Sequence, residues 1–126
     1  MQALKTEILA HDGLLLVTPE YNNGVPGVFK NGIDWLSRAG LKEIFGGLPV
    51  GLMGASPGGF GTVLSQAGWL PTLKLLGVSL YDGGTMYLSR AHTAMNEQGE
   101  LADAQAIENL QRYLTGFGAF AARHRR

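Results

Sequence analysis

The sequence lacks cysteine entirely, so disulfides, thiolate metal sites and cysteine nucleophiles are excluded. It also lacks an excess of either charge, because ten Lys+Arg balance ten Asp+Glu and leave a formal net charge of zero. Nucleic-acid-binding domains usually carry a basic excess, so we expect no nucleic-acid partner. The absence of cysteine fits a cytoplasmic protein.

Long apolar runs are missing as well. The longest, Leu14 to Val17, is far too short to cross a bilayer. Met1 to Ala10 contains Lys5 and Glu7 and does not resemble the unbroken apolar stretch of a signal peptide. We therefore expect no membrane partner. The chain has 126 residues, of which 45% are apolar, and this is typical of one globular domain over 1–126.

Glycine is abundant, with 19 residues of 126, about twice the usual ~7%. The glycines gather between segments of regular apolar spacing, notably at 24 and 27, at 58, 59 and 61, and at 83 and 84. At such points the backbone turns tightly or comes close to another group.

The apolar pattern predicts alternating helices and strands. We expect helices over residues 1–10, 26–40, 62–76 and 103–121, strands over 14–17, 50–53 and 78–81, and irregular structure over 83–101. Leu14 to Val17 has no polar alternation, which is typical of a strand buried on both faces. Alternating strands and helices predict an α/β fold with a parallel sheet between two helical layers. Such sheets bind ligands at the carboxyl ends of their strands, where loops 18–28 and 54–61 lie.

Individual positions carry further expectations. Asp103 is a candidate N-cap, and Pro71 is expected to kink or break its helix. Trp35 and Trp69 are both interpreted as packing residues, and Trp69 is a candidate for the inward face of its helix. Inward-facing positions are predicted at Leu64, Ala67, Ile107, Leu110, Leu114, Phe117 and Ala121.

The loop over residues 18–27 has two readings. It is either a polar turn stiffened by Pro19 and Pro26, or a ligand-binding loop whose amides the two prolines hold in place. Tyr21 offers a flat ring, and Asn22 and Asn23 can both donate and accept hydrogen bonds. A planar heterocycle with alternating donors and acceptors needs such partners.

This region resembles the NADPH-dependent FMN reductase family, which has a flavodoxin-like fold and includes quinone, chromate and azo reductases. The resemblance is carried by Pro19-Glu20-Tyr21-Asn22, by Val25-Pro26-Gly27, and by the run from Lys30-Asn31-Gly32-Ile33-Asp34 to Trp35-Leu36-Ser37-Arg38. Gly32 stands where the family is expected to have alanine. The resemblance implies that Pro19, Glu20, Tyr21 and Asn22 lie against the flavin ring, largely through their backbone groups.

The loop from Gly54 to Thr62 resembles the family's next Gly-rich loop. The resemblance implies that Ser56, Gly58, Gly59 and Gly61 approach the flavin from its other side, where glycine leaves no Cβ in the way. The loop is not a Walker A motif, because no Lys-Ser/Thr pair follows it.

The charged residues of the following helix have two interpretations. Lys30, Asp34 and Arg38 are at (i, i+4) spacing, which favours a solvated helix face, and subunit contacts are the rival interpretation. His92 is interpreted as an exposed or hydrogen-bonded side chain. No residue is assigned as a catalytic nucleophile, base or metal ligand.

The family's phosphate-binding loop, Gly-Ser-x-Arg after a first strand, does not precede Leu14. We therefore expect the chain to correspond to strands 3-4-5 of a flavodoxin-like sheet, truncated at the N-terminus, with Leu14 to Val17 at its edge.

The resemblance implies hydride transfer from NADPH or NADH through FMN to a quinone, flavin or azo acceptor, in a homodimer or homotetramer. One alternative is a non-catalytic fragment or assembly module that binds flavin weakly or not at all. The other is a flavodoxin-like electron carrier, which the neutral charge disfavours because such carriers are usually acidic.

Overall fold

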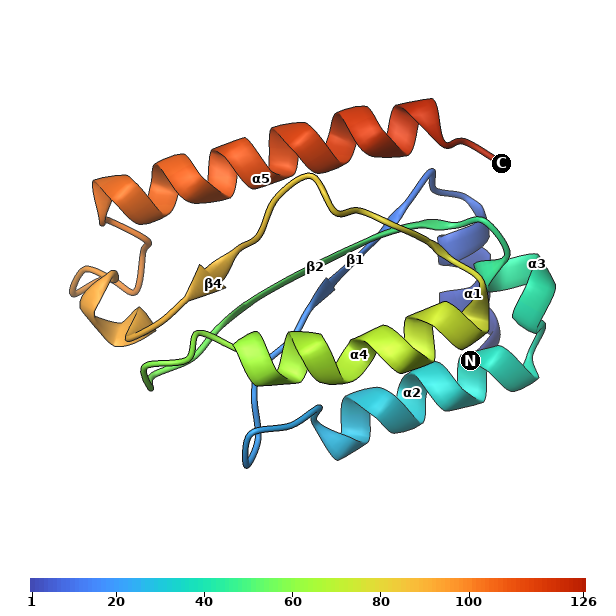
Figure 1. Ribbon diagram of the computed structural model, residues 1–126, viewed down its shortest axis with the longest axis horizontal. Helices are drawn as coiled ribbons and strands as arrows, with labels where there is room; N and C mark the ends of the chain where they lie inside the picture. Colours follow the sequence, from blue (N-terminus) through green and yellow to red (C-terminus); the bar gives the residue numbers. More distant parts are fainter.

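The computed structural model describes residues 1–126 and shows a parallel sheet between two layers of helices (Figure 1). The elements, in chain order, are α1 (Gln2–Leu9), β1 (Leu14–Val17), α2 (Gly27–Arg38), α3 (Leu41–Phe45), β2 (Pro49–Ala55), α4 (Val63–Leu76), β3 (Ser79–Leu80), β4 (Tyr87–Leu88), the 3-10 turn η1 (Ala91–Thr93) and α5 (Ala104–Arg123). Helices α2 and α4 lie side by side on one face of the sheet, and α5 covers the other (Figure 1). The predicted α/β architecture is confirmed.

The sheet has the order β1-β2-β3, and β4 also pairs with β2. All pairs are parallel: Leu14 is opposite Val50, and further along β2 Gly54 is opposite Tyr87. Residues 81–86 therefore leave the sheet between β3 and β4 and return to it. The expectation of irregular structure over 83–101 was wrong at β4 and η1, because pairing with β2 decides a strand of only two residues. The short helix α3 was also not expected.

The main core lies between the sheet and the α2–α4 layer. Trp69 is fully buried, as expected, and its ring meets Phe29 edge-on with 5.0 Å between the ring centroids. Leu36, Ile44 and Phe45 belong to the same cluster of 12 buried residues, and each is at most 2% exposed. Burial of apolar side chains on this scale is the dominant favourable contribution to folding.

Helix α4 turns a different face inward from the one expected. Leu64 and Ala67 are exposed, while Ser65 and Gln66 are buried. The two polar side chains are inside because they find hydrogen-bond partners there. The Ser65 hydroxyl pairs with Thr18 Oγ1 at 3.0 Å, and Gln66 Nε2 donates to the Met86 carbonyl at 3.0 Å. Hydrophobic spacing cannot detect such polar contacts.

Pro71 does not break α4, which continues to Leu76. A proline leaves the carbonyl four residues earlier without its helical partner. That residue is Ala67, which is exposed, so the missing hydrogen bond lies on the solvent-facing side of α4.

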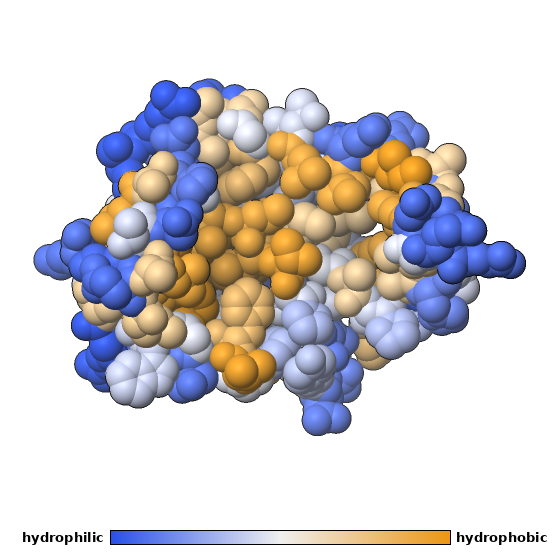
Figure 2. Space-filling view, turned by 180° about the vertical axis from the view of Figure 1, so that it is seen from behind, coloured by the Kyte–Doolittle hydropathy of each residue, from blue (hydrophilic) through white to orange (hydrophobic).

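Two apolar side chains are exposed, one interpreted as a packing residue and one in a strand expected to be buried on both faces. Trp35 on α2 is 59% exposed, and Val17 at the end of β1 is 56% exposed. β1 is the last strand on its side of the sheet and lies toward the back in Figure 1. Figure 2 shows this rear face, on which apolar side chains form a broad patch across the middle. The continuous apolar run of β1 was therefore a good indicator of a strand but a poor one of burial.

Helix α5 begins as expected, because the Asp103 carboxylate accepts a hydrogen bond from Ala106 N–H at 2.9 Å. It packs on the sheet through aromatic rings, with Tyr81 in contact with Tyr113, Phe117 and Phe120. Burial raises the pKa of Tyr113 to about 12. Ala121 is buried as expected, but Leu114 is 43% exposed.

No helix has both the length and the apolar character that spanning a membrane requires.

Candidate functional site

Three connections meet at the carboxyl edge of the sheet, because its strands are parallel. The first leaves β1 at Thr18, which is 1% exposed. Thr18 N–H donates to the Met53 carbonyl at 2.8 Å, and Thr18 Oγ1 accepts from the Trp69 indole at 3.2 Å. The start of this loop is therefore anchored to both β2 and α4.

Residues 21–24 form a tight turn. Tyr21 N–H donates to the Gly24 carbonyl and Gly24 N–H to the Tyr21 carbonyl, at 3.1 and 3.0 Å. Asn22 and Asn23 have φ values of 51° and 61°, which identifies a type I′ turn. Asparagine tolerates this left-handed conformation better than most residues. The turn projects two amide side chains at its tip, and the Tyr21 ring is 57% exposed.

The Glu20 carboxylate links this loop to α4. Its Oε2 accepts hydrogen bonds from Leu64 N–H at 2.9 Å and from Ser65 N–H at 3.0 Å. Thr62, in the N-cap position, has φ of 73° and makes no capping bond. The Glu20 carboxylate instead accepts hydrogen bonds from the free amides in the first turn of the helix. The side chain of Glu20 thus holds the loop in place. This function could not be inferred from the sequence, because the helix it caps begins 43 positions later.

The second connection, after β2, forms the opposite wall of a cavity of about 220 Å³. Its lining residues are Glu20, Asn22, Asn23, Ser56, Pro57, Gly58, Gly59 and Phe60. Glu20, Asn22, Ser56, Gly58 and Gly59 were among the residues expected at the site, and the structure brings them together. Whether they bind a cofactor stays a prediction.

The other three expected residues do not line the cavity. Pro19 and Tyr21 belong to the first loop but lie outside the lining. Gly61 has φ of 56°, and a Cβ there would come within 2.9 Å of the Ser89 nitrogen. The structure therefore gives Gly61 a packing role.

The third connection follows β4 and was not expected at the site. Ser56 N–H donates to the Leu88 carbonyl, Ala91 N–H to the Ser56 carbonyl, and Arg90 N–H to the Gly58 carbonyl, each at 2.9 Å. These bonds fasten residues 88–91 along the second loop. Backbone hydrogen bonds leave no side-chain pattern, so no sequence signal could have revealed this contact.

Strained backbone is concentrated at the same edge. The non-glycine residues with positive φ are Asn22, Asn23, Thr62 and Arg90. All four belong to the connections that follow β1, β2 and β4. Such conformations persist only where surrounding contacts enforce them, and they are typical of ligand sites.

The cavity presents hydrogen-bonding groups on a surface with few side-chain obstructions. Asn22, Asn23 and Ser56 can both donate and accept, and Gly58 and Gly59 expose backbone without a Cβ. No group of three His, Cys, Asp or Glu side chains is placed to hold a metal ion. The arrangement suits the edge and face of a flat, polar heterocycle.

A larger hollow of about 370 Å³ lies along α4, β3 and β4. Its lining is mainly apolar and includes Val63, Leu70 and Tyr87. We place the candidate site at the smaller cavity, because that cavity lies between the two loops that follow β1 and β2 at the carboxyl edge of the sheet.

Comparisons with known proteins agree with this fold. The family model described as NADPH-dependent FMN reductase matches residues 1–93, a range that includes the first two connections and the start of the third. The chain is 34% identical over 119 residues to a 2-hydroxy-1,4-benzoquinone reductase of Burkholderia sp., covering 94% of this chain and 65% of the relative. It is 38% identical over 125 residues to an NAD(P)H-dependent FMN reductase of Pseudomonas aeruginosa, covering 99% of this chain and 67% of the relative.

Among solved structures, the chain resembles the flavoenzyme NAD(P)H:acceptor oxidoreductase FerB from Paracoccus denitrificans. The TM-score is 0.87 at 30% identity, and the alignment covers 99% of this chain and 69% of that protein. The chain thus spans about two thirds of the length of each of these three proteins.

Proposed function

The chain belongs to the NADPH-dependent FMN reductase family, and on that premise we propose that it uses FMN to carry hydride from NAD(P)H to a small-molecule acceptor. Quinones, free flavins and azo compounds are the acceptor class. The observation that carries the proposal is the cavity between the Asn22-Asn23 turn and the loop over residues 56–60.

The lining residues fit the ring of FMN in chemistry. The edge of an isoalloxazine has alternating donors and acceptors, and the Asn22, Asn23 and Ser56 side chains can serve both. Gly58 and Gly59 allow the ring to approach the backbone, because neither has a Cβ. Tyr21 is the first residue of the turn over residues 21–24, and its exposed ring can add an apolar flank.

The hydride chemistry belongs to the bound FMN, and the protein supplies binding and orientation. Glu20 contributes by holding the first loop against α4. Residues 88–91 hold the second loop from its other side. Both walls of the cavity are therefore fixed before a ligand arrives, which lowers the entropy lost on binding.

Reconstitution with FMN tests the proposal. The purified protein is incubated with FMN, desalted, and examined for the visible flavin band and for its bleaching by NADPH or NADH without oxygen. Gly58→Leu is the matched variant, because Gly58 lines the cavity and a Cβ there meets nothing within 4 Å, so a larger side chain fits the fold but takes up space at the site. Gly118→Leu on α5 is the control, since its Cβ also meets nothing within 4 Å.

We expect the wild type and Gly118→Leu to retain FMN and to bleach, and Gly58→Leu to lose most of its FMN while remaining folded. A wild-type protein that takes up no FMN would instead support a non-catalytic assembly module. If Gly58→Leu takes up FMN as well as the wild type does, the flavin binds somewhere other than this cavity.

The same proposal extends to assembly and location. A homodimer or homotetramer is supported by α2, on which Trp35 is 59% and Val28 80% exposed. Such large exposed apolar side chains mark interaction surfaces when they lie together. Lys30 pairs with Asp34 at 2.8 Å on this helix, in agreement with a solvated charged edge beside the apolar side chains. A cytoplasmic location is proposed because NAD(P)H is available there.

A further inference from the structure

Arg90 occupies an unusual backbone position at the candidate site. It lies two residues beyond β4 and has φ and ψ of 47°, in the left-handed region. This conformation is unfavourable for a residue with a Cβ and is normally occupied by glycine or asparagine. Arg90 N–H donates to the Gly58 carbonyl, and the Arg90 carbonyl accepts from Thr93 N–H, both at 2.9 Å. These contacts enforce the conformation.

No interaction of the Arg90 side chain within the protein explains why an arginine occupies this position. It is exposed, and its guanidinium makes no hydrogen bond or ion pair within the chain. The other non-glycine residues in this conformation differ in this respect. Asn22 and Asn23 suit their turn, and the buried Thr62 Oγ1 accepts from Gln66 at 3.0 Å.

The guanidinium lies at the rim of the cavity. Arg90 Nη2 is 3.9 Å from the position that a Cβ on Gly59 would occupy, and Gly59 lines the cavity. The carboxylate of the lining, that of Glu20, is already bonded to the first turn of α4. The Arg90 guanidinium therefore stands at the mouth of the cavity without a partner inside the protein, while the one carboxylate of the lining is already hydrogen-bonded to α4.

We propose that Arg90 binds a phosphate group of NAD(P)H when the dinucleotide docks over the cavity, an inference that rests on the proposed function. A guanidinium holds phosphate through two parallel hydrogen bonds and is less strongly hydrated than an ammonium group. The rim position suits a reductant that arrives from solvent, since its ring can reach the cavity while its charged phosphates remain outside. The strained backbone at Arg90 is then a feature retained for binding.

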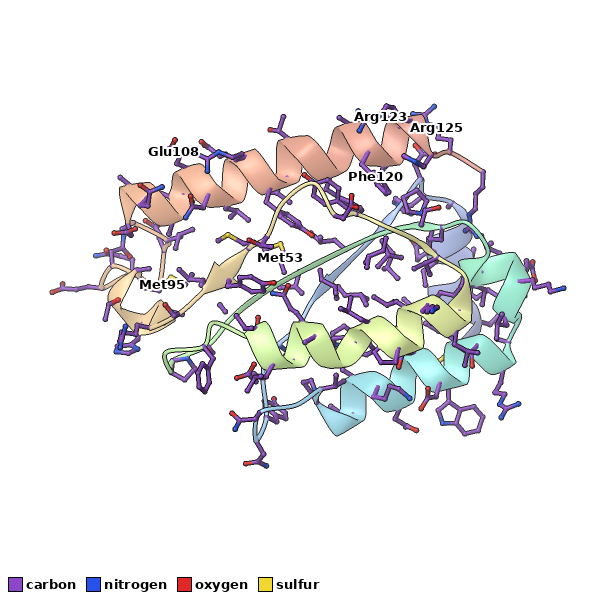
Figure 3. All side chains as sticks on the ribbon, in the orientation of Figure 1. Met53, Met95, Glu108, Phe120, Arg123 and Arg125 are labelled. Atoms are coloured by element: carbon purple, nitrogen blue, oxygen red, sulfur yellow. The ribbon has the colours of Figure 1, made fainter.

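The backbone strain allows a test in which stability and dinucleotide affinity are expected to change in opposite directions. Arg90→Gly removes the side chain and relieves the backbone, so we expect its thermal unfolding midpoint to equal or exceed that of the wild type. Arg90→Lys keeps the charge but not the paired geometry. Arg123→Gln is the control, because it removes one positive charge at the far end of α5 from the loops of the site (Figure 3).

The readouts are calorimetric titrations with NADP⁺ and NAD⁺, together with FMN affinity. We expect Arg90→Gly to bind NADP⁺ about tenfold more weakly, Arg90→Lys to be intermediate, and Arg123→Gln to match the wild type. FMN affinity should stay within about twofold in all of them. Equal losses for NADP⁺ and NAD⁺ would assign Arg90 to the diphosphate, whereas a loss for NADP⁺ alone would assign it to the ribose phosphate.

The outcomes separate this inference from the proposed function. If Arg90→Gly takes up FMN and binds both dinucleotides as the wild type does, Arg90 has no such role while the reductase proposal survives. If the wild type takes up no FMN but its NADP⁺ affinity depends on Arg90, the inference stands and the flavin proposal is wrong. A wild type that binds neither dinucleotide overturns both.

Discussion

Glu20 is the residue on which the geometry of the cavity depends most directly. Its Oε2 accepts from the amides of Leu64 and Ser65 and so joins the first loop to α4. We expect Glu20→Ala to lower the free energy of unfolding by about 1 kcal/mol, the usual effect of losing a helix cap, and to weaken FMN binding. Glu20→Gln keeps an acceptor but loses the charge–dipole attraction, so its effects should be smaller.

Chemical denaturation and FMN titration measure both effects. Glu108→Gln is the control, because Glu108 forms an exposed (i, i+4) pair with Arg112 on α5. Such a pair contributes about 0.3–0.5 kcal/mol at most. Full stability and full FMN affinity in Glu20→Ala would show that the loop is held by its other contacts.

The raised pKa of Tyr113 makes the free energy of unfolding depend on pH in the alkaline range. Burial raises its pKa to about 12 in the folded protein, above the ordinary tyrosine value of 10.0. Between these values the tyrosine ionises in the unfolded chain but not in the folded one, so ionisation favours unfolding as pH rises. We expect the free energy of unfolding to fall across this window by up to about 1.4 kcal/mol per pH unit from this group.

Tyr113→Phe should lack this contribution. Its free energy of unfolding, measured by urea denaturation from pH 9 to about pH 12, should therefore decline less steeply than that of the wild type. Parallel declines would mean that the hydroxyl is solvated and titrates normally.

At the scale of elements, the packing of α5 on the sheet yields a matched pair of substitutions. A Cβ on Gly116 would overlap the Tyr81 hydroxyl, whereas a Cβ on Gly118 would meet nothing within 4 Å. We expect Gly116→Ala to destabilise the protein by about 1–3 kcal/mol through overpacking. Gly118→Ala should stabilise it by up to about 1 kcal/mol through helix propensity. Thermal unfolding of both variants checks the signs, and two stabilised variants would show that Tyr81 moves aside freely.

The elements also show how far apolar spacing predicts structure. The strand at Leu14–Val17 and the helix α2 have long or continuous apolar patterns, and both were located closely. The helix α4 was predicted, but its buried face was not. Ser65 and Gln66 lie on that face because their side chains find hydrogen-bond partners in the interior. β4 has two residues and exists through its pairing with β2, which no local pattern encodes.

At the scale of the whole molecule, the exposed face of α2 predicts an assembly. Trp35 is 59% exposed, so replacing it should hardly change the fold but should weaken a subunit contact that contains it. We expect Trp35→Ser to shift sedimentation toward the monomer while the free energy of unfolding measured under dissociating conditions changes by less than about 0.5 kcal/mol. Leu114→Ser, at a 43% exposed position on α5, is the control. An oligomer that persists in Trp35→Ser would place the interface elsewhere.

The sequence alone determined the family, the parallel α/β fold and the two loops that meet at the cavity. These rest on a contiguous motif from Pro19 to Arg38 and on the period of apolar residues, both of which are local properties of the chain. Of the eight residues expected at the site, Glu20, Asn22, Ser56, Gly58 and Gly59 line the cavity.

Only the tertiary structure decided what the side chains at this edge do. It turned the Glu20 carboxylate toward α4, gave Gly61 a packing role, left Trp35 in solvent and brought Arg90 to the rim of the cavity. Each of these depends on hydrogen bonds or contacts between segments far apart in the chain. Their partners are fixed by three-dimensional packing, and the spacing of residues along the chain contains no record of them.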